Sequence, residues 1–284
     1  MSWVSEPFEL AFMQRALIAS VIVGVLCAII GCYIVLRSMA FLGDALAHAI
    51  LPGVAVAYLV GGEVIVGALV AAVVVALGIS YVSRTGVVRE DTAIGIFFAA
   101  ALALGVVLIS TLDTYAVDLT HVLFGNVLGV TVVDVLVSGV LAIGVLFGIG
   151  FLYRRLLVVS FDPVLGETLG LRTNALRTGL FLMLAVTIVV SLRTVGVALV
   201  AAMLVTPPAA AYLLTSRLPA MMAVSAVIGV MSAVGGLYIS YYLDIAPSGA
   251  MVLLATAIFL IVFVLAPKRG LLSNLRRIRV SSKR

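Results

Sequence analysis

The sequence predicts an all-α fold, a polytopic membrane helical bundle with eight or nine transmembrane helices. Of its 284 residues, 64% are hydrophobic and only 10% are charged, whereas a soluble domain carries roughly 25% charged residues. Apolar runs close to the roughly 20-residue length of a bilayer-spanning helix recur along the chain, separated by short hydrophilic joints. We therefore expect a single transmembrane domain over residues 1–267, followed by a basic tail over 268–284.

The apolar runs place the helices in order. We expect them at about 14–36, 40–60, 63–83, 91–110, 131–153, 176–192, 195–214, 218–242 and 248–267. Only "SLRTVG" separates the sixth segment from the seventh, which leaves open that one of these two crosses the membrane only partly. Eight crossings is therefore the alternative to nine. The double proline in "LVTPPAAAY" (204–212) predicts a broken helix that lines a cavity.

Charge in the joints predicts the orientation. Basic joints face the cytoplasm under the positive-inside rule, and they lie at 83–91, 153–155, 215–219 and in the tail. Joints without Lys or Arg should lie outside, and they are 61–63, 111–118 and 243–249. We expect a multi-pass protein of the cell membrane with a cytoplasmic C-terminus. Much of the net charge of +5 lies in the tail, so it is not a nucleic-acid footprint.

An acidic residue and a histidine interrupt the second apolar run, "LRSMAFLGDALAHAILPG" (36–53). Asp44, His48 and Pro52 are four residues apart and share one helical face. Intramembrane carboxylates usually face a cavity or a pathway, and an Asp–His pair can hold one divalent cation such as manganese, zinc or ferrous iron. Pro52 can kink the helix there. The alternative is structural: Asp44 caps the helix near Arg37, and His48 donates to a neighbouring backbone.

Two further residues are weaker metal-ligand candidates. His121 follows Asp118 at ligand spacing in a stretch that reads as extracellular, where a solvated or capping histidine is the alternative. Asp244 precedes a Pro-Ser-Gly turn, so a role in the turn competes with a role in the pathway. The cysteines Cys27 and Cys32 match neither a redox pair nor a zinc motif, and we interpret them as small buried residues.

A short amphiphilic stretch, "VVSFDPVLGETLGLRTNA" (158–175), is predicted to lie in the cytoplasm. Asp162 followed by Pro163 is typical of a helix start. Glu167 follows in the first turns, and Gly170 suits a helix end. This short helix is either an ordinary connector or a docking surface for a cytoplasmic partner.

The sequence contains no GxxxxGK[ST] phosphate loop, no HExxH motif and no arguable hydrolase constellation. These absences disfavour ATP binding by such a loop, and they disfavour a membrane protease.

Successive blocks of this sequence resemble the permease subunit of bacterial ABC-type manganese, zinc and iron importers. They are "VLRSMAFLGDALAHAILPGVAVAYLVG", "REDTAIGIFF", "SFDPVLGETLGL", "SLRTVGVALVAAMLVTPPAAAYLLT" and "SYYLDIAPSGA", and their order is that of the family. The resemblance implies a homodimeric permease in the membrane lipid, two copies of a separate cytoplasmic ATPase that binds ATP, and an extracytoplasmic metal-binding protein. It thus implies a transport subunit that is not itself an enzyme.

The resemblance also implies roles for residues. Asp44 and His48 occupy the family's positions for metal passage. The stretch 161–171 is the helix that docks in the ATPase, through Phe161, Asp162, Pro163, Gly166, Glu167 and Gly170. No permanently bound cofactor is implied. The transported ion is expected to be manganese, with zinc or iron as alternatives. The competing hypothesis is a self-sufficient, ion-coupled secondary carrier, in which the Asp–His pair would relay protons.

Overall fold

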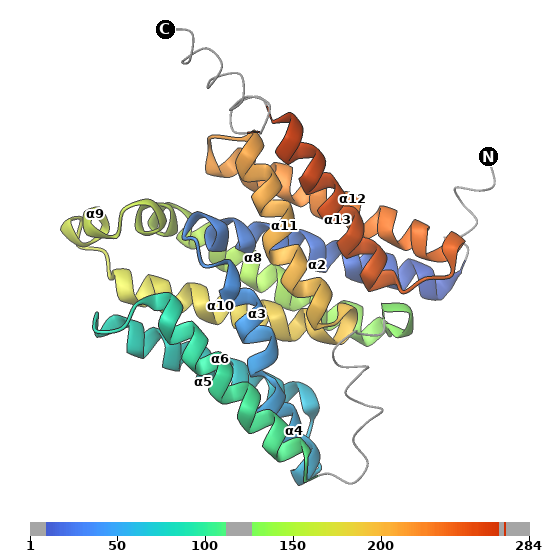
Figure 1. The fold of residues 1–284 in the computed structure, drawn as a ribbon, viewed down its shortest axis with the longest axis horizontal. Coiled ribbons are helices and arrows are strands. Elements are labelled where there is room, and N and C mark those ends of the chain that lie inside the picture. Colours follow the sequence, from blue (N-terminus) through green and yellow to red (C-terminus); the bar gives the residue numbers. More distant parts are fainter. Residues whose placement is uncertain (1–9, 112–126, 267–269, 271–284) are drawn as a thin grey trace, which may run out of the picture.

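The computed structural model describes residues 10–111, 127–266 and 270, and all regular structure within them is helical. Figure 1 shows the helices, which are α2 (Ala11–Leu36), α3 (Ala40–Ala49), α4 (Leu51–Val60), α5 (Val64–Arg84), α6 (Glu90–Ile109), α8 (Val132–Phe161), α9 (Pro163–Thr168), α10 (Thr173–Val195), α11 (Val197–Leu214), α12 (Leu218–Leu243) and α13 (Pro247–Leu265). A 3₁₀ turn, η2 (Val127–Gly129), precedes α8.

The described part of the chain holds eight helical segments long and apolar enough to cross a membrane, if α3 and α4 are counted as one. The shorter apolar helix α11 accounts for the ninth expected segment. It separates from α10 at Gly196, whose φ of 83° lies in the region that favours glycine. The predicted division between these two helices is therefore confirmed.

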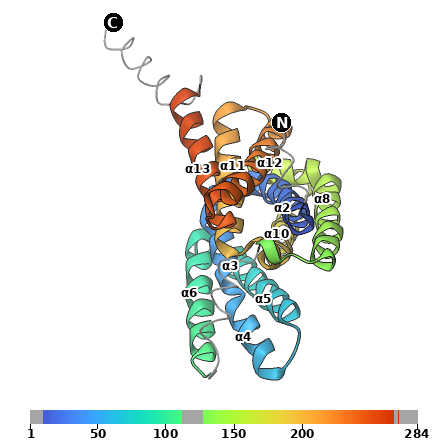
Figure 2. The ribbon, with the colours of Figure 1, turned by 90° about the vertical axis from the view of Figure 1, so that its right-hand side faces the viewer.

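Helix α2 lies at the centre of the bundle and packs against α8, α10, α11 and α12 (Figure 2). Small residues permit a close approach of α2 to α12. A Cβ atom added to Gly24 would lie 3.3 Å from the carbonyl oxygen of Gly229. Membrane helices associate through such contacts because burial against lipid supplies no hydrophobic driving force between them.

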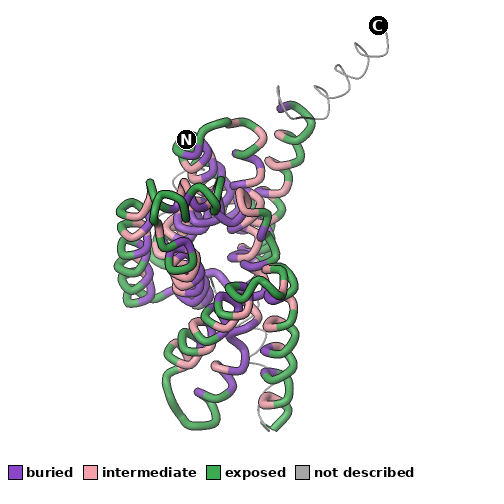
Figure 3. The backbone as a smooth tube through the Cα atoms, turned by 90° about the vertical axis from the view of Figure 1, so that its left-hand side faces the viewer, coloured by how far each residue is buried: buried purple, intermediate pink, exposed green. Residues whose placement is uncertain are grey.

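Helices α3 to α6 form a second group, which Figure 2 shows in its lower half and which joins the first through contacts of α5 with α10 and of α3 with α11. Buried residues line the inside of the whole bundle, and exposed residues follow its outer helices (Figure 3). On α8 the exposed side chains are large and apolar, with Ile143, Phe147 and Phe151 between 69% and 77% exposed. Such a surface is stable in hydrocarbon and costly in water.

The double proline does not break its helix, so the predicted broken span is wrong. Helix α11 continues through Pro207 and Pro208. Pro208 has no N–H for the carbonyl of Leu204, but that carbonyl is covered by α2 at Gly31, where a Cβ atom would collide with it. The close packing of two helices therefore shields the orphaned carbonyl from lipid and keeps α11 continuous.

Helix α8 is longer than predicted, because it continues past Tyr153 to Phe161 and has 30 residues. It begins at a capping box, in which the Thr131 hydroxyl accepts from the Asp134 N–H while the Asp134 carboxylate accepts from the Thr131 N–H. It ends where Asp162 takes up extended backbone.

The connections lie at two ends of the bundle. Figure 1 places the α5–α6 connection, α9, the α11–α12 connection and the end of α13 towards one end, and the α4–α5 and α12–α13 connections towards the other. The first end thus holds joints that contain Lys or Arg, and the second end holds joints that contain neither.

Candidate metal centre

The segment that carries Asp44 and His48 is held between two breaks in the helical backbone. Helix α2 ends at Leu36, and Ser38 has a φ of 57°, so the chain turns sharply into α3. Helix α3 ends at Ala49, and α4 begins at Leu51 with Pro52 as its second residue. The interruption lies beside Pro52, where the sequence predicts a kink. Proline at this position leaves the His48 carbonyl without its helical N–H partner, which favours a break.

Asp44 and His48 lie side by side on α3. The His48 Nε2 atom is 3.6 Å from the Asp44 Oδ1 atom, and the two side chains are 27% and 44% exposed respectively. Two ligands on one tetrahedral cation at metal–ligand distances of about 2.1 Å lie about 3.4 Å apart. The pair thus has the spacing of two donors to a single ion.

The structure does not support the capping alternative for Asp44. Asp44 lies inside α3, whose N-cap is Met39. Arg37, the basic residue that the alternative placed near it, instead pairs with Glu90 at 3.6 Å. Among the described residues, His48 is therefore the side chain that lies within ion-pair distance of the Asp44 carboxylate.

One aromatic ring, from Phe98 of α6, packs against the histidine. Phe98 of α6 contacts the His48 ring edge to face, with centroids 5.9 Å apart, and contacts Phe41 in the same way at 5.3 Å. On another face of α3, Gly43 lies against Leu204 of α11. These contacts fix α3 between α6 and α11 and restrict the orientation of the imidazole.

An ion triad ties three helices together beside the start of α3. Glu90, at the start of α6, lies 3.6 Å from Arg37 and 3.7 Å from Arg177 of α10. Arg37 is only 10% exposed. Burial lowers the pKa of Arg37, with Arg177 adding to the effect, whereas Glu90 opposes it. One carboxylate thus compensates two cations that are largely removed from water.

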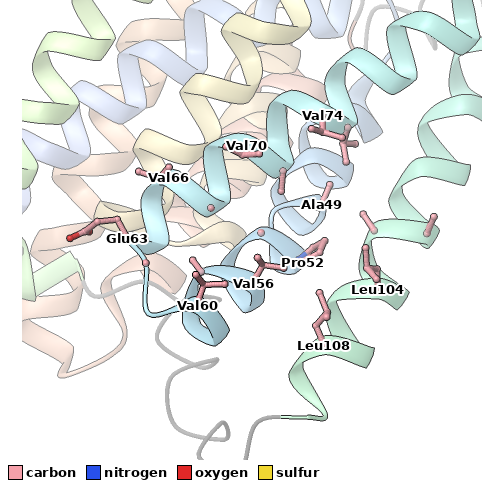
Figure 4. Close-up of a pocket in the computed structure, with 18 of the residues that line it drawn as sticks. Ala49, Pro52, Val56, Val60, Glu63, Val66, Val70, Val74, Leu104 and Leu108 are labelled. Atoms are coloured by element: carbon pink, nitrogen blue, oxygen red, sulfur yellow. The ribbon is translucent and has the colours of Figure 1, made fainter.

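A cavity of about 620 Å³ lies between α4, α5 and α6, and its lining begins directly after His48, with Ala49 and then Pro52 (Figure 4). Its lining in the described residues is apolar except for Glu63. An apolar wall offers no ligand to a cation, so we assign this cavity no part in holding the metal.

Of the two weaker ligand candidates, the structure describes only Asp244. Asp244 is exposed in a left-handed turn at the end of α12, with a φ of 52°, which fits its alternative role in the turn. His121 lies outside the described residues. Among the residues that are described, no group of three or more His, Cys, Asp or Glu side chains could hold a metal ion.

The predicted short helix between α8 and α10 is present as α9. The Asp162 carboxylate caps it by accepting from the Leu165 N–H at 3.0 Å, and Pro163 is its first residue. It ends in a Schellman motif. The Gly170 N–H donates to the Glu167 carbonyl, the Leu171 N–H donates to the Gly166 carbonyl, and Gly170 has a φ of 72°. Both predicted helix signals are confirmed.

The residues named for docking divide into two kinds. Gly166 is buried, and a Cβ atom there would lie 3.1 Å from Thr173, so it seats α9 on the rest of the chain. Glu167 accepts a hydrogen bond from the Thr173 hydroxyl and holds the same junction. The exposed face is apolar instead. We call it the α9 surface, and it comprises Phe161, Val164, Leu165 and Leu169, which are 48% to 71% exposed.

Sequence reasoning missed Phe98, the ion triad and most of the α9 surface. Phe98 lies in an apolar run next to another phenylalanine, and the local sequence does not show which of the two contacts His48. The apolar residues of "FDPVLGETLGL" could have been assigned to a partner, because a helix of six residues outside the membrane has no core of its own.

The apolar bundle, the Asp44–His48 pair inside it and the exposed α9 surface define a polytopic membrane protein of the transport class. The chain matches the ABC 3 transport family over residues 9–266, and it belongs to that family. It is therefore a multi-pass membrane protein.

Relatives and a solved structure of known description agree with this assignment. The chain is 46% identical to the manganese transport system membrane protein MntC of Listeria monocytogenes, over 98% of this chain and 99% of that one. It is 39% identical to the manganese import system permease protein ScaB of Streptococcus gordonii, over 93% and 94%. Its fold is similar to a chain of PsaBC from Streptococcus pneumoniae in complex with Fab, with a TM-score of 0.83 and 36% identity over 94% and 96%.

Proposed function

We propose that this chain is the membrane-spanning permease subunit of an ATP-driven importer of divalent transition metal ions, with manganese as the favoured cargo. The observation that carries the proposal is the Asp44–His48 pair, placed at ligand spacing on a helix inside the bundle. Manganese accepts both oxygen and imidazole donors, and the relatives named above are described as manganese transporters. Zinc and iron are the alternative cargoes.

The pathway is completed by a second copy of the chain. One copy supplies two donors, whereas a divalent transition ion takes four or more. Both donors remain partly exposed on a single copy, and a two-fold axis beside α3 would bring two equivalent pairs together. We therefore propose a homodimer in which each copy contributes Asp44 and His48.

The energy source is a separate subunit. The sequence has no phosphate loop, so we propose that ATP binds to two cytoplasmic ATPase subunits and that this chain catalyses no reaction. The α9 surface is suited to docking, because large apolar side chains outside the membrane are stabilised when a partner removes them from water.

Charge supports the orientation. Exposed arginines at the α9 end include Arg84, Arg89, Arg155, Arg172 and Arg217. We propose that this end, with the C-terminus, faces the cytoplasm. The opposite end would then receive the ion from an extracytoplasmic metal-binding protein.

Co-purification and transport together test the proposal. The chain would be produced with its candidate ATPase, purified in detergent, reconstituted into vesicles and assayed for accumulation of radioactive manganese. We expect uptake only with both subunits and hydrolysable ATP. Uptake by the chain alone, driven by a proton gradient, would instead establish the secondary carrier, which membership of an ABC family disfavours.

A further inference from the structure

A second cavity, of about 550 Å³, lies beside α9 between the end of α8 and the start of α10. Its lining residues are Leu152, Arg155, Gly170, Leu171, Arg172, Ala175 and Leu176. We call it the α8–α10 cavity. Its volume lies in the range of about 300–1,000 Å³ that is typical of small-molecule sites. Neither the metal pair nor the α9 surface contributes a side chain to it.

Two arginines give this cavity its charge. Arg155 and Arg172 are both exposed, and in the described part of the chain neither forms an ion pair with a carboxylate. The nearby Glu167 accepts a hydrogen bond from the Thr173 hydroxyl and forms an ion pair with neither arginine. The guanidinium groups are therefore available to an anion, and their planar donor sets match phosphate.

The depth of the cavity follows from the length of α8. Its 30 residues rise about 45 Å, whereas the hydrocarbon core is about 30 Å thick. A span that starts at Val132 uses about 20 residues to cross and leaves the hydrocarbon near Leu152. Arg155 then lies at the depth of the lipid headgroups. Arg172, just before α10, reaches the same depth from the other side of the cavity.

The lining has the polarity of a phospholipid. Leu152, Ala175 and Leu176 lie further from α9 along the chain of α8 and α10, whereas Arg155 and Arg172 lie about one turn nearer to it. Figure 1 shows these ends of α8 and α10 next to α9. We propose that the α8–α10 cavity binds the phosphate headgroup of an anionic phospholipid, with the acyl chains against its leucines. Basic pockets between membrane helices bind such lipids in this way.

Lipid titration followed by native mass spectrometry tests the inference in the purified full chain. The probes are phosphatidylglycerol and phosphatidylcholine with identical acyl chains. We expect preferential binding of phosphatidylglycerol, weakened about fivefold by Arg155→Gln and by Arg172→Gln, since one arginine near the surface contributes about 1 kcal/mol. Arg155→Lys and Arg172→Lys retain the charge and should retain most of the binding.

Arg84→Gln is the matched control, because Arg84 is exposed at the same end of the bundle and outside this cavity. Its phosphatidylglycerol binding should equal that of the native chain. Equal weakening by Arg84→Gln and Arg155→Gln would overturn the site, since it would reveal a diffuse charge effect. Displacement of phosphatidylglycerol by millimolar inorganic phosphate would also overturn it, in favour of a soluble anion.

If the ATPase subunit, and not a lipid, contacts the two arginines, the same variants give a different result. If the double variant of Arg155 and Arg172 keeps its native preference for phosphatidylglycerol but loses the ATPase subunit, the lipid proposal fails and the arginines belong to the docking surface. The lipid measurement needs neither ATPase nor metal, so its outcome is independent of the transport assay.

Discussion

The imidazole of His48 on α3 and the phenyl ring of Phe98 on α6 meet edge to face, with their centroids 5.9 Å apart. This contact joins the helix of the metal pair to the helix that opens with the ion triad. It gives an apolar residue a place beside the proposed pathway, although Phe98 has no atom that can bind a cation.

Replacing Phe98 with Ala should loosen the imidazole. Aromatic pairs contribute about 0.5–1.5 kcal/mol beyond burial, so we expect the KM for manganese to rise about two- to tenfold. Phe98→Tyr keeps the ring and should remain close to native. The measurement is uptake into vesicles over a range of manganese concentrations. A native KM for Phe98→Ala would mean that the ring does not position His48.

Removing either donor should abolish transport without unfolding the chain. Asp44→Ala and His48→Ala each delete a ligand, while alanine maintains the helix. We expect manganese uptake to fall by at least about tenfold, because even outer-shell partners of a metal ligand contribute that much. Assembly with the ATPase should persist. Asp91→Ala, which removes an exposed carboxylate from α6, is the control. Native uptake by both pair variants would falsify the ligand assignment.

Neutralising the centre of the ion triad should destabilise the bundle. Glu90→Gln leaves Arg37 and Arg177 close together without a counter-charge. Breaking a buried pair costs about 3–5 kcal/mol, and the partial exposure of Glu90 favours the lower end. Thermal unfolding in detergent should therefore begin at a lower temperature. Glu90→Asp should restore part of the loss, and Asp91→Asn should have little effect.

A charge on the α9 surface should release the ATPase. Val164 is 71% exposed, and covering a valine contributes about 1.5–3 kcal/mol. Val164→Asp should therefore lower the affinity for the ATPase by at least about tenfold in a pull-down titration, with unchanged thermal stability. Val87→Asp lies in the α5–α6 connection at the same end and is 86% exposed. If both variants lose the ATPase equally, α9 has no special part in docking.

Cysteine labelling checks the orientation in intact cells. Gly62 lies in the exposed α4–α5 connection and Val87 in the α5–α6 connection, at opposite ends of α5. A membrane-impermeant maleimide should label Gly62→Cys and leave Val87→Cys unmodified. The native Cys27 and Cys32 are fully buried and should remain silent. The reverse pattern would place α9 outside the cell.

The prolines show where the sequence predicts the fold and where it does not. The sequence predicts a kink at Pro52 and a broken helix at the pair Pro207–Pro208. The helix is interrupted beside Pro52 but continues through the pair. The difference lies in α2, whose Gly31 covers the carbonyl that Pro208 leaves unpaired. A contact between helices more than 170 residues apart cannot be found from the local sequence.

The sequence likewise predicts one part of the candidate site and not the other. The i, i+4 spacing of Asp44 and His48 predicts that they lie side by side, and they do. The structural alternative for Asp44 places Arg37 near it. Arg37 pairs instead with Glu90, because the start of α6 packs beside the end of α2. Local periodicity predicts neighbours on one helix, whereas the partners of a charge depend on packing between helices.

The interruption at Ile50 has a mechanical consequence. Pro52 cannot donate to the His48 carbonyl, so the junction of α3 and α4 lacks a hydrogen bond that a straight helix would make there. A change of angle at this point sacrifices no such bond, whereas the same change within α3 would cost about 0.5–1.5 kcal/mol for each bond lost. The second span thus contains a pivot one half-turn beyond His48. Because this point lies beyond both donors, bending there would leave the spacing of Asp44 and His48 on α3 unchanged.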